Sequence, residues 1–291
     1  MLRRMFAVLA FALAIAPVAS AQTVDEVIAK NIAARGGMDK IKAVQTIRMT
    51  GKMTVGPGME APMIMEMRRP DQMKMQFTLQ GMTGIQAYDG KLGWSVMPFM
   101  GKKDPEAMSA DDVKELVDQA DIDGPLVDYK TKGHTVELLG KESVEGTDAY
   151  KLKLTLKTGT VRTIYIDADN FMEIKNDGKR MVRGTEIEFE GTMGDFKPVA
   201  GVMYPYSMEN SAKGHPEKQK LTVDSIAVNV PLTANDFTMP ARADSGAAMP
   251  ATASEAKTGQ KTESEKAASA KAAIAPAVEA KKAAKKPSGK P

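Results

Sequence analysis

The feature that most constrains this chain is an alternation of apolar and polar residues that begins at Gln45. Residues 63–67 and 73–79 carry a methionine or another apolar residue at every second position. Because successive side chains of a β-strand point to opposite faces, this period of two predicts strands with one apolar face. Other strand-like stretches, separated by turn-forming residues, cover 45–55, 85–88, 94–97, 134–141, 149–157, 160–167, 171–175, 181–190, 202–210 and 217–229. We therefore expect a mainly β chain, built as one large curved antiparallel sheet or open barrel of about eleven strands.

Two segments break the alternation with helical patterns. Thr23 and Glu26 form a capping-box pattern at the start of 24–44, which Gly36 and Gly37 divide into two helical pieces. Ser109 is a predicted N-cap for a helix over 109–120. These helices could cover the concave face of the sheet without filling it. Turns are predicted at 89–90, 176–178 and 191–194, where glycine and asparagine or aspartate gather.

The two ends of the chain differ from its middle. Residues 1–21 have a basic start, an apolar run and an Ala-x-Ala ending, which predicts a signal peptide cleaved after Ala21 and a periplasmic product. Residues 241–291 are rich in alanine, lysine and proline, and their composition predicts a disordered tail. The remaining residues, 22–240, carry a net charge of −4 and are expected to form one domain. That charge argues against nucleic-acid binding by the folded part.

The sequence offers little for catalysis. It has no cysteine and only two histidines, His134 and His215, and neither lies in a recognisable nucleophile or zinc motif. Glu186, Glu188 and Glu190 alternate on one face of a predicted strand, which is typical of a solvated face rather than a catalytic pair. We therefore expect no enzyme activity, no catalytic residue, no metal ligand set of the zinc kind and no cofactor.

Methionine is the unusual component, since nine methionines fall within the 34 residues 49–82. Three interpretations remain open. The methionines could fill an ordinary core, or they could line a cavity that repacks around acyl chains, because the thioether side chain is flexible and polarizable. They could also bind Cu(I), which thioethers suit, through the methionines of 63–67 and 73–75. The residues expected to line an apolar cavity are Met49, Met53, Met63, Met65, Met67, Met73, Met75, Phe77, Leu79 and Trp94.

Several short motifs in 22–240 resemble the periplasmic lipoprotein carriers LolA and LolB, in particular the free-standing outer-membrane lipoprotein-sorting proteins. Their order along the chain carries the resemblance more than any one of them. They are Ala-Arg-Gly-Gly-Met-Asp-Lys-Ile-Lys-Ala-Val (34–44), Arg-Pro (69–70), Tyr-Asp-Gly-Lys-Leu-Gly-Trp (88–94), Met-Pro-Phe (97–99), Asp-Gly-Pro-Leu-Val-Asp-Tyr (123–129), Gly-Thr-Asp-Ala-Tyr-Lys-Leu (146–152) and Val-Asn-Val-Pro-Leu-Thr-Ala-Asn-Asp-Phe-Thr-Met-Pro (228–240).

The resemblance implies an unclosed antiparallel half-barrel of about eleven strands with helices across its concave face. It implies a monomeric carrier whose apolar interior takes up the acyl chains of lipoproteins or a related lipid, with an inner-membrane donor complex and an outer-membrane acceptor as partners. In LolA the arginine of the Arg-Pro motif holds a helical lid closed by hydrogen bonds, and Arg69 matches that arginine. The chain departs from the family in its number of methionines, its lysine-rich tail and the absence of the cysteine that anchors LolB.

Overall fold

A computed structural model describes residues 22–56, 58–182, 185–215 and 217–241. The predicted signal peptide and all but the first residue of the predicted tail lie outside these residues. Among the described residues, no helix is both long enough and apolar enough to cross a membrane.

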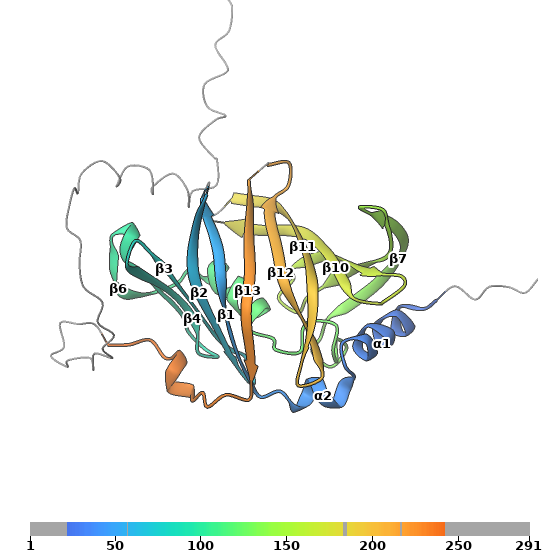
Figure 1. Cartoon of the computed structure of the whole chain (residues 1–291), viewed down its shortest axis with the longest axis horizontal. Helices are drawn as coiled ribbons and strands as arrows, with labels where there is room; N and C mark the ends of the chain where they lie inside the picture. Colours follow the sequence, from blue (N-terminus) through green and yellow to red (C-terminus); the bar gives the residue numbers. More distant parts are fainter. Residues whose placement is uncertain (1–21, 57, 183–184, 216, 242–291) are drawn as a thin grey trace, which may run out of the picture.

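The described chain forms one unclosed antiparallel sheet of thirteen strands (Figure 1). Its order is β6-β5-β4-β3-β2-β1-β13-β12-β11-β10-β9-β8-β7, so β1 and β13 join the two halves, and β6 and β7 are the free edges. The strands are β1 (Thr46–Gly56), β2 (Met59–Arg68), β3 (Gln72–Leu79), β4 (Met82–Tyr88), β5 (Gly93–Met97), β6 (Lys102–Ala107), β7 (Thr135–Val144), β8 (Thr147–Thr155), β9 (Val161–Asp167), β10 (Glu173–Val182), β11 (Thr185–Val199), β12 (Val202–Ala212) and β13 (Lys218–Val228).

The mainly β, unclosed half-barrel expected from the sequence is confirmed, with more strands than the expected number of about eleven. The prediction missed β6 because its Lys-Lys-Asp-Pro-Glu-Ala sequence has no apolar alternation. The predicted turns at 176–178 and 191–194 are wrong, since both segments lie inside continuous strands, β10 and β11. Their glycines mark close approach instead: a Cβ on Gly178 would lie 2.8 Å from the carbonyl oxygen of Val161, and one on Gly191 would lie 2.5 Å from Oδ1 of Asn210.

Three α-helices follow the predicted helical segments. They are α1 (Val24–Ala34), α2 (Met38–Ala43) and α3 (Ala110–Gln119), and two short 3-10 helices, η1 (Pro98–Met100) and η2 (Ala234–Phe237), complete the described elements. The capping box of Thr23 and Glu26 forms as predicted, and Ser109 caps α3. Gly36 separates α1 from α2 because its φ of +119° and its contact with the carbonyl oxygen of Gly201 leave no space for a side chain.

The helices bury the apolar face of the sheet in three clusters. In the first, Val27 and Ile28 of α1 pack with residues of β7, β8 and β9 such as Leu152 and Ile164. In the second, α2 and the loop before β7 pack with β1, β2, β12 and β13. In the third, Leu116 of α3 packs with β3 and β4. Figure 1 shows α1 and α2 at one end of the strands, where the chain enters the sheet.

Candidate functional site: an apolar face with a polar latch

The register of the first three strands gathers the methionines on one face. Met49 of β1 lies opposite Met65 of β2, which lies opposite Met75 of β3. The next row joins Ile47, Met67 and Met73 in the same way, and the row on the other side joins Gly51, Met63 and Phe77. Directly opposed residues of an antiparallel pair point to the same side of the sheet. The alternation in the sequence therefore becomes a continuous methionine face.

The side chains of the methionine face differ in how deeply they are buried. Met63 and Met73 are 2% and 0% exposed, and Met49 and Leu79 are also buried, so these four side chains belong to the core in this structure. Met53, Met65, Met67, Met75 and Phe77 are partly buried and keep accessible surface. An apolar ligand could therefore meet the second group directly, whereas Met49 and Met63 pack with α2 and the loop before β7, and Met73 packs with α3.

The apolar face continues past β1 into the second half of the sheet. Met53 lies opposite Leu221 of β13, and Leu221 lies opposite Met208 of β12. These side chains and Tyr206 are partly buried and pack against the same cluster as Met65 and Phe77. The lining predicted from the methionine-rich segment 49–82 does not include this continuation. The reason is that β12 and β13 are joined to β1 only by long-range pairing.

Trp94 does not belong to this face, so its expected place in the lining is wrong. It lies opposite Ala87, which lies opposite Lys74, and Lys74 lies opposite Glu66. This row is on the side of the sheet opposite Met65 and Met75. The indole Nε1 donates a hydrogen bond of 2.8 Å to the carbonyl oxygen of Phe237 in η2, and Trp94 is only 3% exposed. Trp94 therefore anchors η2 to the side of the sheet opposite the methionine face.

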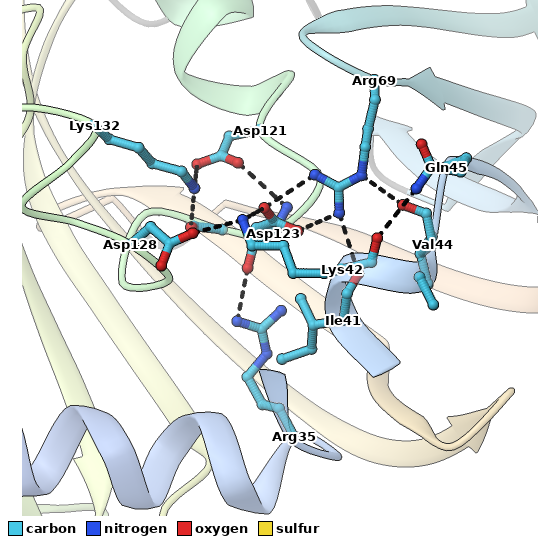
Figure 2. A network of polar contacts seen from close by, with 12 residues as sticks. Arg35, Ile41, Lys42, Val44, Gln45, Arg69, Asp121, Asp123, Asp128 and Lys132 are labelled. Atoms are coloured by element: carbon cyan, nitrogen blue, oxygen red, sulfur yellow. Dashed lines mark hydrogen bonds and ion pairs between the residues drawn. The ribbon is translucent and has the colours of Figure 1, made fainter. Parts of the chain in front are cut away.

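Arg69, which follows β2, reaches the helical cover (Figure 2). Its Nε donates a hydrogen bond of 2.6 Å to the carbonyl oxygen of Val44, and one terminal nitrogen donates at 3.1 Å to the carbonyl oxygen of Ile41. The other terminal nitrogen donates at 3.0 Å to Oδ2 of Asp123, and the first also donates to Oδ1 of the same carboxylate. Arg69 thus ties the turn between β2 and β3 to α2 and to the loop before β7.

Asp123 is the centre of this arrangement, and its carboxylate is only 3% exposed. Lys42 of α2 donates a hydrogen bond of 2.6 Å to Oδ2 of Asp123 and also forms an ion pair of 2.7 Å with Asp128. Arg35, at the end of α1, donates at 2.8 Å to the backbone carbonyl of Asp123. We refer to Arg35, Lys42, Arg69 and Asp123 as the latch. It joins the α1–α2 region to the β2–β3 turn and to the loop before β7, which lie far apart in the sequence (Figure 2).

A second ion pair holds the loop that carries Asp123. Nζ of Lys132 lies 2.6 Å from Oδ2 of Asp121 and also donates at 2.9 Å to the carbonyl oxygen of Gly124. Oδ1 of Asp121 accepts a hydrogen bond of 3.2 Å from the backbone nitrogen of Asp123. These hydrogen bonds within the loop help to hold the Asp123 carboxylate in the position where it contacts Arg69.

The charged side chains of the latch shift one another's pKa values. Burial opposes the charge of Asp123, but hydrogen bonds from Arg69 and Lys42 outweigh it and lower the pKa of this carboxyl to about 2. The hydrogen bond with Asp123 raises the pKa of Arg69, against the effect of burial. Burial lowers the pKa of Arg35, a result of its position behind the loop. Asp123 and Arg69 are thus both charged at neutral pH.

The loop that carries Asp123 also packs against the methionine face. Ile122 and Val127 flank Asp123 in the loop and belong to the same buried cluster as Met49 and Met63. A loop released from Arg69 would lift these two apolar side chains off the methionines. Arg69 and Asp123 thus hold a loop whose apolar side chains pack in the same cluster as the methionines.

A separate cavity of about 560 Å³ lies between α3 and the strands β9–β11. Its wall carries charged side chains of both signs, unlike the methionine face. Arg162 lies in this wall, 3.4 Å from Oδ2 of Asp118. The cavity is lined by Asp111, Lys114, Glu115, Thr158, Gly159, Thr160, Val161, Arg162, Thr163, Asp177, Gly178, Lys179, Glu186, Glu188, Phe189 and Lys213.

Nδ1 of His134 accepts a hydrogen bond from the backbone nitrogen of Lys157, in a loop away from the methionines. Within the described ranges, no group of three or more His, Cys, Asp or Glu side chains is placed to hold a metal ion. The face itself offers thioether and aromatic side chains, which suit apolar ligands.

The sequence predicted a role in the lid for Arg69 but for no other member of the latch. Asp123 stands in the Asp-Gly-Pro motif and Arg35 in the Ala-Arg-Gly-Gly motif, so both were visible without an assigned role. A charged residue beside glycine in a predicted loop is an ordinary surface pattern. Only the tertiary structure shows that these charges face one another.

Comparisons with known proteins agree with this architecture. A domain described as an outer membrane lipoprotein-sorting protein from Vibrio parahaemolyticus is similar over 73% of this chain and 94% of its own, with a TM-score of 0.51 and 13% identity. A LolA superfamily protein from Nitrosomonas europaea is similar over 75% of this chain and 98% of its own, with a TM-score of 0.52 and 16% identity.

The fold is LolA-like. A DUF1329 family protein from Desulfovibrio piger shows the same similarity, with a TM-score of 0.53, 12% identity, and coverage of 75% of this chain and 98% of its own. No family model matches the sequence, and no curated protein matches it. At these identities the similarity to the LolA-like structures is one of fold.

Proposed function

We propose that this protein is an exported, monomeric, non-enzymatic carrier that holds the acyl chains of lipoproteins or related lipids in transit toward the outer membrane. The observation that carries the proposal is the partly accessible apolar face that runs from β3 through β1 to β12, under helices fastened by the latch. The LolA-like fold supports it, because one structural relative is described as a lipoprotein-sorting protein domain. The periplasm, an inner-membrane donor and an outer-membrane acceptor belong to the same proposal.

Apolar burial is sufficient to drive such binding. Each buried methylene contributes about 0.8 kcal/mol, so a sixteen-carbon chain could contribute on the order of 10 kcal/mol before the costs of association. Methionine side chains adapt to chains of different shape because each has three rotatable bonds. Arg69 and Asp123 would act as the gate, since they hold Ile122 and Val127 over the buried methionines.

The lining can be tested with Met65, which is partly buried at the centre of the face. In Met65→Glu, a charge lies where the acyl chain would lie, so binding of a fluorescent fatty acid such as parinaric acid should be lost. Met65→Leu keeps the surface apolar and should bind as the wild type does. Fluorescence titration of both variants measures the effect.

Ile64→Glu is the matched control, because Ile64 is the neighbouring residue on the opposite face and is 38% exposed. It should bind the probe normally. If Met65→Glu binds as tightly as Ile64→Glu while both remain folded by circular dichroism, the methionine face is not the binding site.

A further inference from the structure

The methionine face contains a row of sulfur ligands that the carrier proposal does not explain. Met49, Met65 and Met75 are directly opposed on three adjacent strands. Adjacent strands lie about 4.8 Å apart, whereas alternate residues along one strand lie about 6.6 Å apart. Pairing across the sheet therefore brings neighbouring thioethers closer together than the sequence spacing alone allows.

The three side chains lie on the side of the sheet where Ile41 of α2 and the loop before β7 pack. Met65 and Met75 keep accessible surface, and Met49 is buried beside them at 9% exposure. Met67, one pair along the same strands, is also partly buried and lies opposite Met73. An ion could reach the sulfurs of Met65 and Met75 from the accessible surface, and Met49 would be its third, buried ligand.

The donor set selects the kind of ion. The chain has no cysteine, so methionine is its only source of sulfur ligands. Thioethers are soft and uncharged, and they favour Cu(I) over the harder divalent ions that prefer imidazole or carboxylate. A neutral site also suits a monovalent ion, since fewer charges must be desolvated without an anionic partner.

We propose that the Met49–Met65–Met75 row binds one soft monovalent cation through its three thioether sulfurs, with Cu(I) as the biological ion. The site shares Met65 and Met75 with the proposed acyl-chain surface, but it does not depend on lipid binding. It needs sulfur at these positions, whereas a lipid needs only apolar surface.

The test uses silver nitrate in chloride-free buffer, because Ag(I) is a soft monovalent ion that is stable in air. The purified protein, labelled with ¹³C at the methionine methyl groups, is titrated and followed by native mass spectrometry and NMR. One Ag(I) per chain should bind, and the methyl resonances of Met49, Met65 and Met75 should shift together. Met65→Leu and Met75→Leu should each weaken binding at least tenfold.

Met38→Leu is the control, since Met38 is 37% exposed at the start of α2 and lies away from the row. It should bind Ag(I) as the wild type does. Equal Ag(I) affinity in Met65→Leu and wild type, or no bound ion at a tenfold excess, would overturn the proposal. The fatty-acid probe is titrated separately into the metal-free wild-type protein, so failure of the metal site and failure of the carrier function give different results.

Discussion

At the scale of single residues, Arg69 is the side chain whose role is most open to measurement. It donates hydrogen bonds to Val44, Ile41 and Asp123, and thereby fastens the cover over the methionines. In the carrier account these bonds stabilise the closed, empty form. A ligand that needs the cover to lift must therefore compete with them.

Arg69→Leu removes this competition, so the apparent affinity for the fatty-acid probe should rise about tenfold, which corresponds to ~1.4 kcal/mol. Transfer of the probe to acceptor vesicles should become slower, because the closed form of the cover no longer competes with the bound probe. Stopped-flow fluorescence measures the transfer rate. Arg48→Leu is the control, as Arg48 bonds to Glu66 on the opposite face of the sheet, away from the latch. Equal transfer rates in the two variants would exclude gating by Arg69.

Asp123 gives the latch a defined pH dependence. Its pKa is about 2 in the folded protein and 3.8 for the free side chain, so its contribution to stability is complete above pH 4. That contribution is lost as the pH falls from about 4 to about 2, and it amounts to about 2 kcal/mol at ~1.4 kcal/mol per pKa unit. Asp123→Asn should lack it.

Urea unfolding of the wild type and Asp123→Asn between pH 7 and pH 2 measures this difference. The two free energies of unfolding should converge toward the acid end. A constant gap across this range would show that the Asp123 carboxylate does not hold the latch by its charge.

At the scale of elements, the break between α1 and α2 depends on backbone space. A Cβ at Gly36 would lie 2.1 Å from the carbonyl oxygen of Gly201, whereas one at Gly37 would meet no atom within 4 Å. Both glycines have positive φ, +119° and +92°, so alanine is strained at either position.

Gly36→Ala should therefore destabilise the protein by about 3 kcal/mol and Gly37→Ala by about 1 kcal/mol, the difference being the clash with the β11–β12 turn. Differential scanning calorimetry provides the comparison. Similar melting temperatures for the two variants would mean that α1 and β12 do not pack as closely as described.

The element scale also shows where the sequence was informative. Alternation predicted β2 and β3, and the residue types at the helix starts predicted both helix caps. Both kinds of feature depend on neighbouring residues. It failed at β6, which is an edge strand with charged residues, and at Gly178 and Gly191. Those glycines are fixed by close approach to another strand, which local sequence does not encode.

At the scale of the whole molecule, an unclosed sheet leaves one apolar face that only helices and ligand can cover. Alternation predicted which methionines share that face, since parity is a local property. The latch could not be predicted in the same way. Asp123 and Arg69 are 54 positions apart, and their hydrogen bonds depend on how the loop before β7 folds over β1.

The most direct test of the carrier account is native mass spectrometry of the protein purified gently from a periplasmic extract, where the account expects it. The account predicts an adduct with the mass of a lipid or acylated peptide, which organic extraction removes and Met65→Glu abolishes. A bare protein that also fails to take up added fatty acid or lipopeptide would contradict it, and the methionine face would then be only the core of the fold.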